Sequence, residues 1–248
     1  MPDTTSTVER FTVRSGVRIR YLDNSPEHPS GLPILLSPGF TDFADEYIDV
    51  LQFFGPRRLL VVEVRGRGGS EAPATGYTSA DHARDLRAVL EEEGLDRFHL
   101  MTFSRGTTWG LDLVLADPSR VASVSIGDYW AREHALEPSV AEQVMSTRFR
   151  GRPMSERIAA HVLPELFRLS NHRDLCGELA ATGLPVLVAT GTEAGCLLAP
   201  EAVQEYRDRI PSVEVVVIPG AGHDLFRPDR LAYPRAAQVF IGRRAPGT

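Results

Sequence analysis

The 248-residue sequence contains no lysine, and its 27 basic residues are all arginine. This absence excludes chemistry that needs a lysine amine, such as a Schiff base with a carbonyl substrate or the phosphate-binding lysine of a Walker motif. The two cysteines, Cys176 and Cys196, are too few for a disulfide framework and are compatible with a reducing compartment.

Long apolar runs are also missing. No run approaches the ~18 residues that a membrane-spanning helix needs, and residues 1–10 are polar and acidic. The formal charge of −6 is spread along the chain, which argues against nucleic acid or an anionic membrane surface as a partner. The seven histidines show no metal-ligand spacing. We therefore expect a cytoplasmic protein that acts on a small molecule without a metal or cofactor.

The chain does contain an alternation of strand and helix patterns. A period-two pattern predicts a hairpin over residues 11–22, and buried strands then alternate with helices, which is typical of a mostly parallel sheet. The predicted later strands cover residues 32–36, 58–64, 98–103, 121–127, 185–190 and 213–218. The predicted helices cover residues 43–54, 79–93, 106–116, 200–210 and 231–241. The fold class is therefore α/β, with helices flanking a central sheet.

This alternation is interrupted by residues 131–182, which have only helical patterns. Three prolines divide this insertion: Pro138, Pro153 and Pro164. We predict a single domain over residues 1–248, with a core of 1–130 and 183–248. The insertion would be a small helical cap over the carboxyl edge of the sheet, where sites in open α/β folds lie.

Ser104 lies at the bend between a predicted buried strand and a predicted helix, in the stretch T-F-S-R-G. This is the arrangement of a nucleophile elbow, whose tight turn strains the serine backbone and exposes the hydroxyl above the sheet. Small residues are needed two positions before and after the serine, so that the helix can cross close to the strand. Gly106 meets this need, but Thr102 does not. Taken alone, a Ser-x-Gly pattern is weak evidence for a nucleophile, and a helix-capping serine is the simpler interpretation.

Four motifs in chain order make the sequence resemble the α/β-hydrolase family everywhere except in the insertion. Residues 36–40 (LSPGF) resemble the family's strand and His-Gly turn, with Pro38 in place of histidine. Residues 63–70 (EVRGRGGS) match its Asp-x-Arg-Gly-x-Gly-x-Ser loop, with Glu63 in place of aspartate. The elbow is the third motif, and residues 219–223 (PGAGH) match the segment that delivers the catalytic histidine.

The resemblance implies a serine hydrolase with an α/β-hydrolase fold. Ser104 would be the nucleophile and His223 its base, since a serine hydroxyl is poorly nucleophilic near neutral pH. By family position, the backbone N–H groups of Phe40 and Arg105 would bind the oxyanion. Each such donor is worth roughly 2.7–4 kcal/mol where one has been removed.

The acid of the triad departs from the common pattern. Its usual position, three residues after Gly191, is occupied by Ala194, and Glu193 is one position out of register. A minority of the family carries the acid at the end of the preceding strand, where Asp128 lies. Either carboxylate could orient the imidazole. We favour Asp128 because it is in register, with Glu193 as the alternative acid and a turn cap as the alternative role of Asp128.

The insertion would act as a lid that supplies the substrate pocket. The candidate pocket residues are Phe43, Trp130, Phe149, His161 and Phe167. Arg148, Arg150 and Arg152 could meet a substrate carboxylate, although a solvated loop is the simpler interpretation because acidic residues elsewhere in the insertion balance them.

Three hypotheses follow. The leading one is a serine hydrolase that cleaves a small ester, lactone, thioester or amide through an acyl-enzyme. In the second, a dyad of His223 and Asp128 deprotonates a substrate for cofactor-free oxygenation, lyase chemistry or carbon–carbon cleavage. The third is a ligand-binding protein with a decayed triad, for which Thr102 and Ala194 are the evidence.

Overall fold

The computed structural model describes residues 6–243 and contains an eight-stranded sheet of order β1-β2-β4-β3-β5-β6-β11-β12. The pairs β1–β2 and β2–β4 are antiparallel and all the others are parallel, as predicted. The strands are β1 (Val8–Arg14), β2 (Val17–Asp23), β3 (Ile34–Ser37), β4 (Leu59–Glu63), β5 (Phe98–Phe103), β6 (Val121–Gly127), β11 (Val186–Gly191) and β12 (Val213–Ile218). The predicted domain limits include residues 1–5 and 244–248, which lie outside the described residues.

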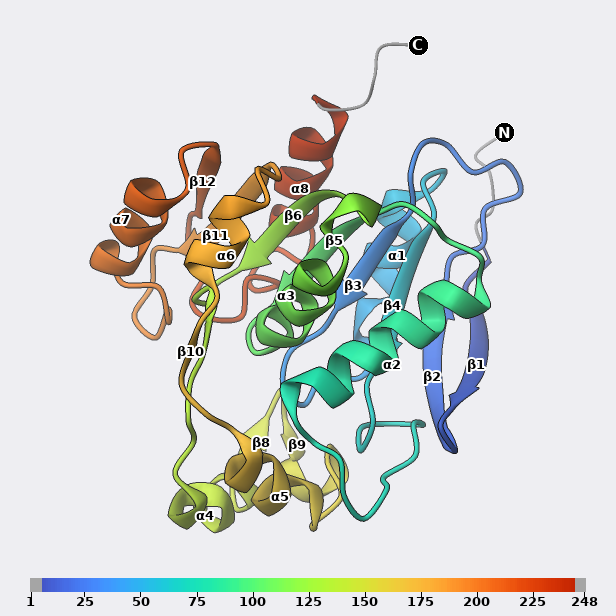
Figure 1. Cartoon of the computed structure of the whole chain (residues 1–248), viewed down its shortest axis with the longest axis vertical. Helices are drawn as coiled ribbons and strands as arrows, with labels where there is room; N and C mark the ends of the chain where they lie inside the picture. Colours follow the sequence, from blue (N-terminus) through green and yellow to red (C-terminus); the bar gives the residue numbers. More distant parts are fainter. Residues whose placement is uncertain (1–5, 244–248) are drawn as a thin grey trace.

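Helices cover both faces of the sheet (Figure 1). One face carries α2 (Ser79–Glu92), α3 (Gly106–Ala116), α6 (Cys176–Ala181) and α7 (Pro200–Arg209), whose apolar residues share one buried cluster. The opposite face carries α1 (Ile48–Phe54) and α8 (Ala232–Gly242), which contribute to a second cluster. The sheet is therefore the middle layer of three.

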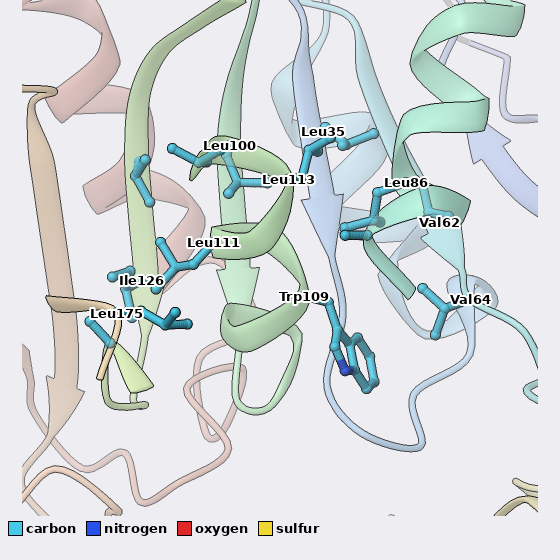
Figure 2. Packing of buried hydrophobic residues seen from close by; sticks show 14 of the residues in the cluster. Leu35, Val62, Val64, Leu86, Leu100, Trp109, Leu111, Leu113, Ile126 and Leu175 are labelled. Carbon is cyan, nitrogen blue, oxygen red and sulfur yellow. The ribbon is translucent and has the colours of Figure 1, made fainter. Parts of the chain in front are cut away.

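The strand and helix on either side of Ser104 are anchored in the first cluster. All six residues of β5 are buried between β3 and β6. Figure 2 shows Leu100 of β5, Ile126 of β6 and two leucines of α3, Leu111 and Leu113, where the helix packs on the sheet. Each fully buried leucine contributes about 1.5–3 kcal/mol, so this packing fixes the position of the serine turn.

The elements next to the site have nearly the predicted bounds, with two differences. The predicted helix over 43–54 is divided into a 3₁₀ turn, η1 (Ala44–Tyr47), and α1. The helix predicted over 79–93 ends one residue earlier, at Glu92, and its N-cap is Thr78, whose side chain accepts a hydrogen bond from the N–H of Asp81.

The segment between β6 and β11 contains short strands as well as helices. Two antiparallel pairs of two-residue strands, β7 with β10 and β8 with β9, are too short to leave a periodic signal in the sequence. The order is β7 (Arg132–Glu133), η3 (Pro138–Val140), α4 (Ala141–Met145), β8 (Arg148–Phe149), β9 (Arg152–Pro153), η4 (Met154–Glu156), α5 (Val162–Leu169), β10 (Arg173–Asp174) and α6. Pro164 does not break α5, because it lies in the first turn, where its missing N–H costs no helical hydrogen bond. Figure 1 shows α4, α5 and the β8–β9 hairpin together at one end of the sheet.

Candidate active site

Ser104 occupies the sharp turn between β5 and α3. Its φ of +51° lies in the left-handed region, and its N–H donates to the carbonyl of Gly127 at 2.9 Å. A Cβ at Gly106 would lie 2.1 Å from the carbonyl oxygen of Pro38 and 2.4 Å from that of Ser37, so only glycine fits there. This is the strained strand–turn–helix geometry that the elbow motif predicts.

Thr102 is accommodated because the helix carries a glycine where it crosses the strand. A Cβ at Gly110 would lie 2.8 Å from the Cγ2 of Thr102. The Thr102 hydroxyl is also satisfied, 2.9 Å from the hydroxyl of Thr107 and 3.3 Å from the carbonyl of Ser125. The close approach that the motif requires is therefore made at Gly110 instead of at position 102.

The structure brings Ser104, His223 and Asp128 into one hydrogen-bonded line. The Nε2 of His223 is 2.9 Å from the Oγ of Ser104, and its Nδ1 is 2.8 Å from the Oδ2 of Asp128. The side chain of His223 is 28% exposed, whereas that of Asp128 is fully buried. With Nδ1–H donating to the carboxylate, the lone pair of Nε2 faces the Ser104 hydroxyl and can accept a hydrogen bond from it.

Asp128 is held by donors on both oxygens. Besides His223, its carboxylate accepts from the Thr190 hydroxyl at 3.0 Å and from the N–H groups of Leu197 and Leu198 at 2.8 and 3.2 Å. Two of these donors are backbone N–H groups, one on each oxygen. Because an N–H group cannot accept a hydrogen bond, both oxygens of the carboxyl group act as acceptors. None of these three supporting residues has a signal in the sequence that would have identified it.

Glu193, the alternative acid, is not part of this hydrogen-bonded line. Its side chain is exposed on the loop after β11 and accepts from the Thr192 hydroxyl at 3.1 Å. The Nδ1 of His223 is engaged by Asp128 instead. The ring of Phe103, which precedes the serine, stacks on the imidazole with centroids 5.2 Å apart.

The two predicted oxyanion donors remain available. Among the described residues, neither the N–H of Phe40 nor that of Arg105 has a hydrogen-bond acceptor. The turn that carries Phe40 is fixed by its neighbours, since the Gly39 N–H donates to the carboxylate of Asp42 at 3.0 Å and the Phe40 carbonyl accepts from the Nε of Arg67 at 2.9 Å.

Arg67 is an unexpected member of this region. It occupies a variable position of its loop motif, yet it is only 1% exposed. Its guanidinium lies over the rings of Phe40 and Trp109, at 5.5 and 5.0 Å from their centroids. Burial lowers the pKa of Arg67 to about 9.

The insertion contacts the loops of the candidate site through Arg150. This side chain, 7% exposed, pairs with Asp224 at 2.9 Å and with Glu46 at 3.1 Å, and lies 3.6 Å from Asp42. Although burial opposes ionisation, the hydrogen bonds and charge of Arg150 lower the pKa of Asp224, the residue after His223. Arg150 is thus saturated by carboxylates of the chain and is not free to meet a substrate carboxylate.

Three of the predicted pocket residues lie where the insertion meets the Phe40 loop. The rings of Phe40 and Phe167 are 6.4 Å apart. The guanidinium of Arg157 lies between Phe43 and Phe149, at 4.7 and 5.1 Å from their ring centroids.

The other two predicted pocket residues have different neighbours. Trp130 packs on the ring of His134 at 4.7 Å, and His161 is exposed with its Nε2 3.0 Å from the carbonyl oxygen of Pro73. Within the described part of the chain, neither has a hydrogen bond or ring contact with Ser104 or His223. The sequence contains no signal that would distinguish an exposed histidine or a packed aromatic residue, such as these two, from a residue that lines a pocket.

Residues 6–243 contain no cluster of His, Cys, Asp and Glu side chains suited to a metal ion. None of the described helices has the length and apolar character required to cross a membrane.

The chain belongs to the alpha/beta hydrolase family, whose model matches residues 34–233. RutD of Variovorax paradoxus, named as a carbamate hydrolase, is 37% identical over 79 residues, which are 32% of this chain and 30% of RutD. A haloalkane dehalogenase of Psychrobacter cryohalolentis is 32% identical over 119 residues, 46% of this chain and 38% of the relative. The chain therefore matches less than half of the length of either relative.

Solved structures match over nearly the whole chain. MGS-M2, an alpha/beta hydrolase from a deep-sea metagenome, has a TM-score of 0.80 at 14% identity and covers 96% of this chain and 99% of its own. The esterase RhEst1 of Rhodococcus has a TM-score of 0.77 at 21% identity, with coverage of 97% and 100%. The predicted α/β-hydrolase fold is confirmed.

Proposed function

We propose that this protein is a serine hydrolase that cleaves a small ester, lactone, thioester or amide through an acyl-enzyme. The observation that carries the proposal is the line of two hydrogen bonds, 2.9 Å from Ser104 to His223 and 2.8 Å from His223 to Asp128. Hydrolytic relatives, among them proteins named as a carbamate hydrolase and a dehalogenase, support the class of reaction without specifying the substrate.

In the proposed reaction the Oγ of Ser104 attacks the substrate carbonyl carbon while the Nε2 of His223 accepts the hydroxyl proton. The imidazolium is stabilised by Asp128, and the N–H groups of Phe40 and Arg105 hold the oxyanion. The tetrahedral intermediate then collapses, His223 gives the proton to the leaving group, and the acyl group stays on the serine. Water, deprotonated by the same imidazole, releases the acid and regenerates the hydroxyl.

We also propose that residues 131–182 form the lid of this site. The proposal is supported by the ion pairs of Arg150, which link the β8–β9 hairpin to Glu46 and to Asp224, the residue beside the proposed base. Movement of such a lid would control how a substrate reaches Ser104, which is 9% exposed.

The test compares Ser104→Ala with Ser119→Ala, a control serine outside the site. We expect Ser104→Ala to abolish both hydrolysis of a 4-nitrophenyl ester and covalent labelling by a fluorophosphonate, and Ser119→Ala to retain both. Labelling that survives in Ser104→Ala would refute the nucleophile. If Ser104→Ala instead keeps its activity while His223→Ala loses it, the His–Asp dyad is the catalyst.

A further inference from the structure

Two buried arginines at the proposed oxyanion site have N–H groups without a partner. Arg67 and Arg105 are 1% and 6% exposed. The Nη2 of Arg67 and the Nε of Arg105 are buried and have no acceptor within the described part of the chain. Leaving a donor of a buried charged group unpaired is costly, so these N–H groups need an acceptor that the described chain does not supply, either a water or a ligand.

The charge of Arg67 is not compensated by a carboxylate. Its other N–H groups donate to the carbonyls of Phe40 and Arg65 and to the Nε2 of His82 at 2.8 Å. The Nδ1 of His82 lies 2.8 Å from the Thr78 carbonyl and must donate to it, so Nε2 accepts and the ring is neutral. Burial and the charge of Arg67 both lower the pKa of His82, in agreement with that neutral form.

The neighbouring arginine of the same loop shows the ordinary arrangement. Arg65 makes a bidentate pair with Asp85, with N–O distances of 2.7 and 2.9 Å. Arg105 has only a distant acid, since the carboxylate of Glu133 is 3.9 Å away and is already bound by Arg173 at 3.0 Å. Among the described residues, Arg67 therefore has no salt-bridge partner, whereas Arg105 shares the carboxylate of Glu133 with Arg173.

Both cations adjoin the groups that would hold the reacting carbonyl. The Nε of Arg67 binds the Phe40 carbonyl, and Arg105 directly follows Ser104. We propose that Arg67 and Arg105 bind a carboxylate of the substrate, so that the enzyme prefers esters, lactones or amides that carry a free carboxylate. The inference rests on the proposed function and narrows its substrate class. Guanidinium groups suit this role because they form charge-assisted hydrogen bonds with carboxylates.

The competing explanation is that Arg67 only holds the Phe40 turn in place. The two roles differ in their dependence on substrate charge. A turn-holding residue affects all substrates alike, whereas a carboxylate-binding residue affects only those with the negative group.

The first measurement therefore compares the 4-nitrophenyl half-ester of glutaric acid with 4-nitrophenyl pentanoate, which has the same chain length and no carboxylate. Arg67→Met should lower kcat/KM for the half-ester by about 10- to 100-fold more than for the pentanoate. Arg67→Lys, which keeps the charge, should recover part of the preference. Arg168→Met, which removes an arginine with a 62% exposed side chain in α5, is the control and should change neither ratio. A wild-type enzyme with no preference for the half-ester, or equal losses on both esters in Arg67→Met, would overturn the proposal.

The second measurement does not need turnover. Glutarate should raise the Tm of Ser104→Ala, and adding Arg67→Met should remove that shift. If the shift occurs but no ester is hydrolysed, the anion site stands and the hydrolase proposal fails. If esters are hydrolysed but glutarate gives no shift, or gives the same shift without Arg67, the anion site is refuted and the hydrolase proposal stands.

Discussion

Replacing Asp128 by Asn tests the proposed triad where its geometry is best defined. The carboxylate accepts four hydrogen bonds, two on each oxygen. The asparagine amide has a single oxygen, so its NH₂ must face one of the two donor pairs. The less costly choice is the pair made by Thr190 and Leu198, because the Thr190 hydroxyl can turn and accept. The Leu198 N–H, whose bond is the longest at 3.2 Å, then loses its acceptor.

Two magnitudes follow from this arrangement. One buried N–H without an acceptor should destabilise Asp128→Asn by about 1–3 kcal/mol. The hydrogen bond to His223 can survive, but the negative charge that stabilises the imidazolium is gone. We therefore expect kcat to fall by up to about 10⁴, equivalent to about 5.5 kcal/mol of transition-state stabilisation.

The assay is hydrolysis of a 4-nitrophenyl ester together with the rate of fluorophosphonate labelling, and urea melts measure the stability change separately. Glu193→Gln is the matched control, because its carboxylate is exposed and bonded to Thr192, and it should keep wild-type rates. The assignment would be wrong if Asp128→Asn kept about a tenth or more of the activity, or if Glu193→Gln lost as much.

Three further changes have defined outcomes. Arg150→Met should destabilise the protein by roughly 3 kcal/mol in urea melts and lower kcat, because it leaves Asp224 without its buried cation; an unchanged melt would contradict the network. Gly106→Ala should unfold at lower temperature and lose activity, since its Cβ would lie 2.1 Å from the backbone oxygen of Pro38, and a wild-type Tm would show that the turn can relax. Burial lowers the pKa of His99 from 6.5 to about 4. Between these two pH values His99 is therefore protonated in the unfolded chain but not in the folded chain. His99 should leave the free energy of unfolding unchanged above pH 6.5 and lower it by up to about 3 kcal/mol as the pH falls to 4. In urea melts between pH 4 and 6.5, His99→Gln should show a correspondingly smaller dependence of this free energy on pH.

The sequence predicts the parallel core well because each of its elements has a local signal. Residues 98–103 and 106–116 have the predicted bounds, since a mainly apolar strand and a glycine at the helix start both mark the boundary. The short strands around residues 132, 148, 152 and 173 have no such signal, because two residues cannot show a period.

The candidate site is predictable in the three side chains of its hydrogen-bonded line but not in what surrounds them. Ser104, His223 and Asp128 stand at strand ends that the chain order brings to one edge. The donors to Asp128 include two backbone amides that lie about 70 residues further along the chain, and a backbone N–H carries no residue preference. The burial of Arg67 could not be predicted from the sequence for a related reason. Its partners are mainly backbone carbonyls and aromatic rings, and not an acidic residue that would pair with it.

Three of the departures from the family pattern have a counterpart elsewhere in the structure. Thr102 replaces a glycine, and Gly110 on the facing helix provides the space. Ala194 leaves the usual acid position empty, and Asp128 meets the imidazole from the neighbouring strand. Glu63 replaces an aspartate, and its longer side chain is fully buried with three donors at 2.8 Å, from two backbone N–H groups and one guanidinium. Thr102 and Ala194, the two substitutions that suggested a decayed triad, are therefore also compatible with the proposed active enzyme.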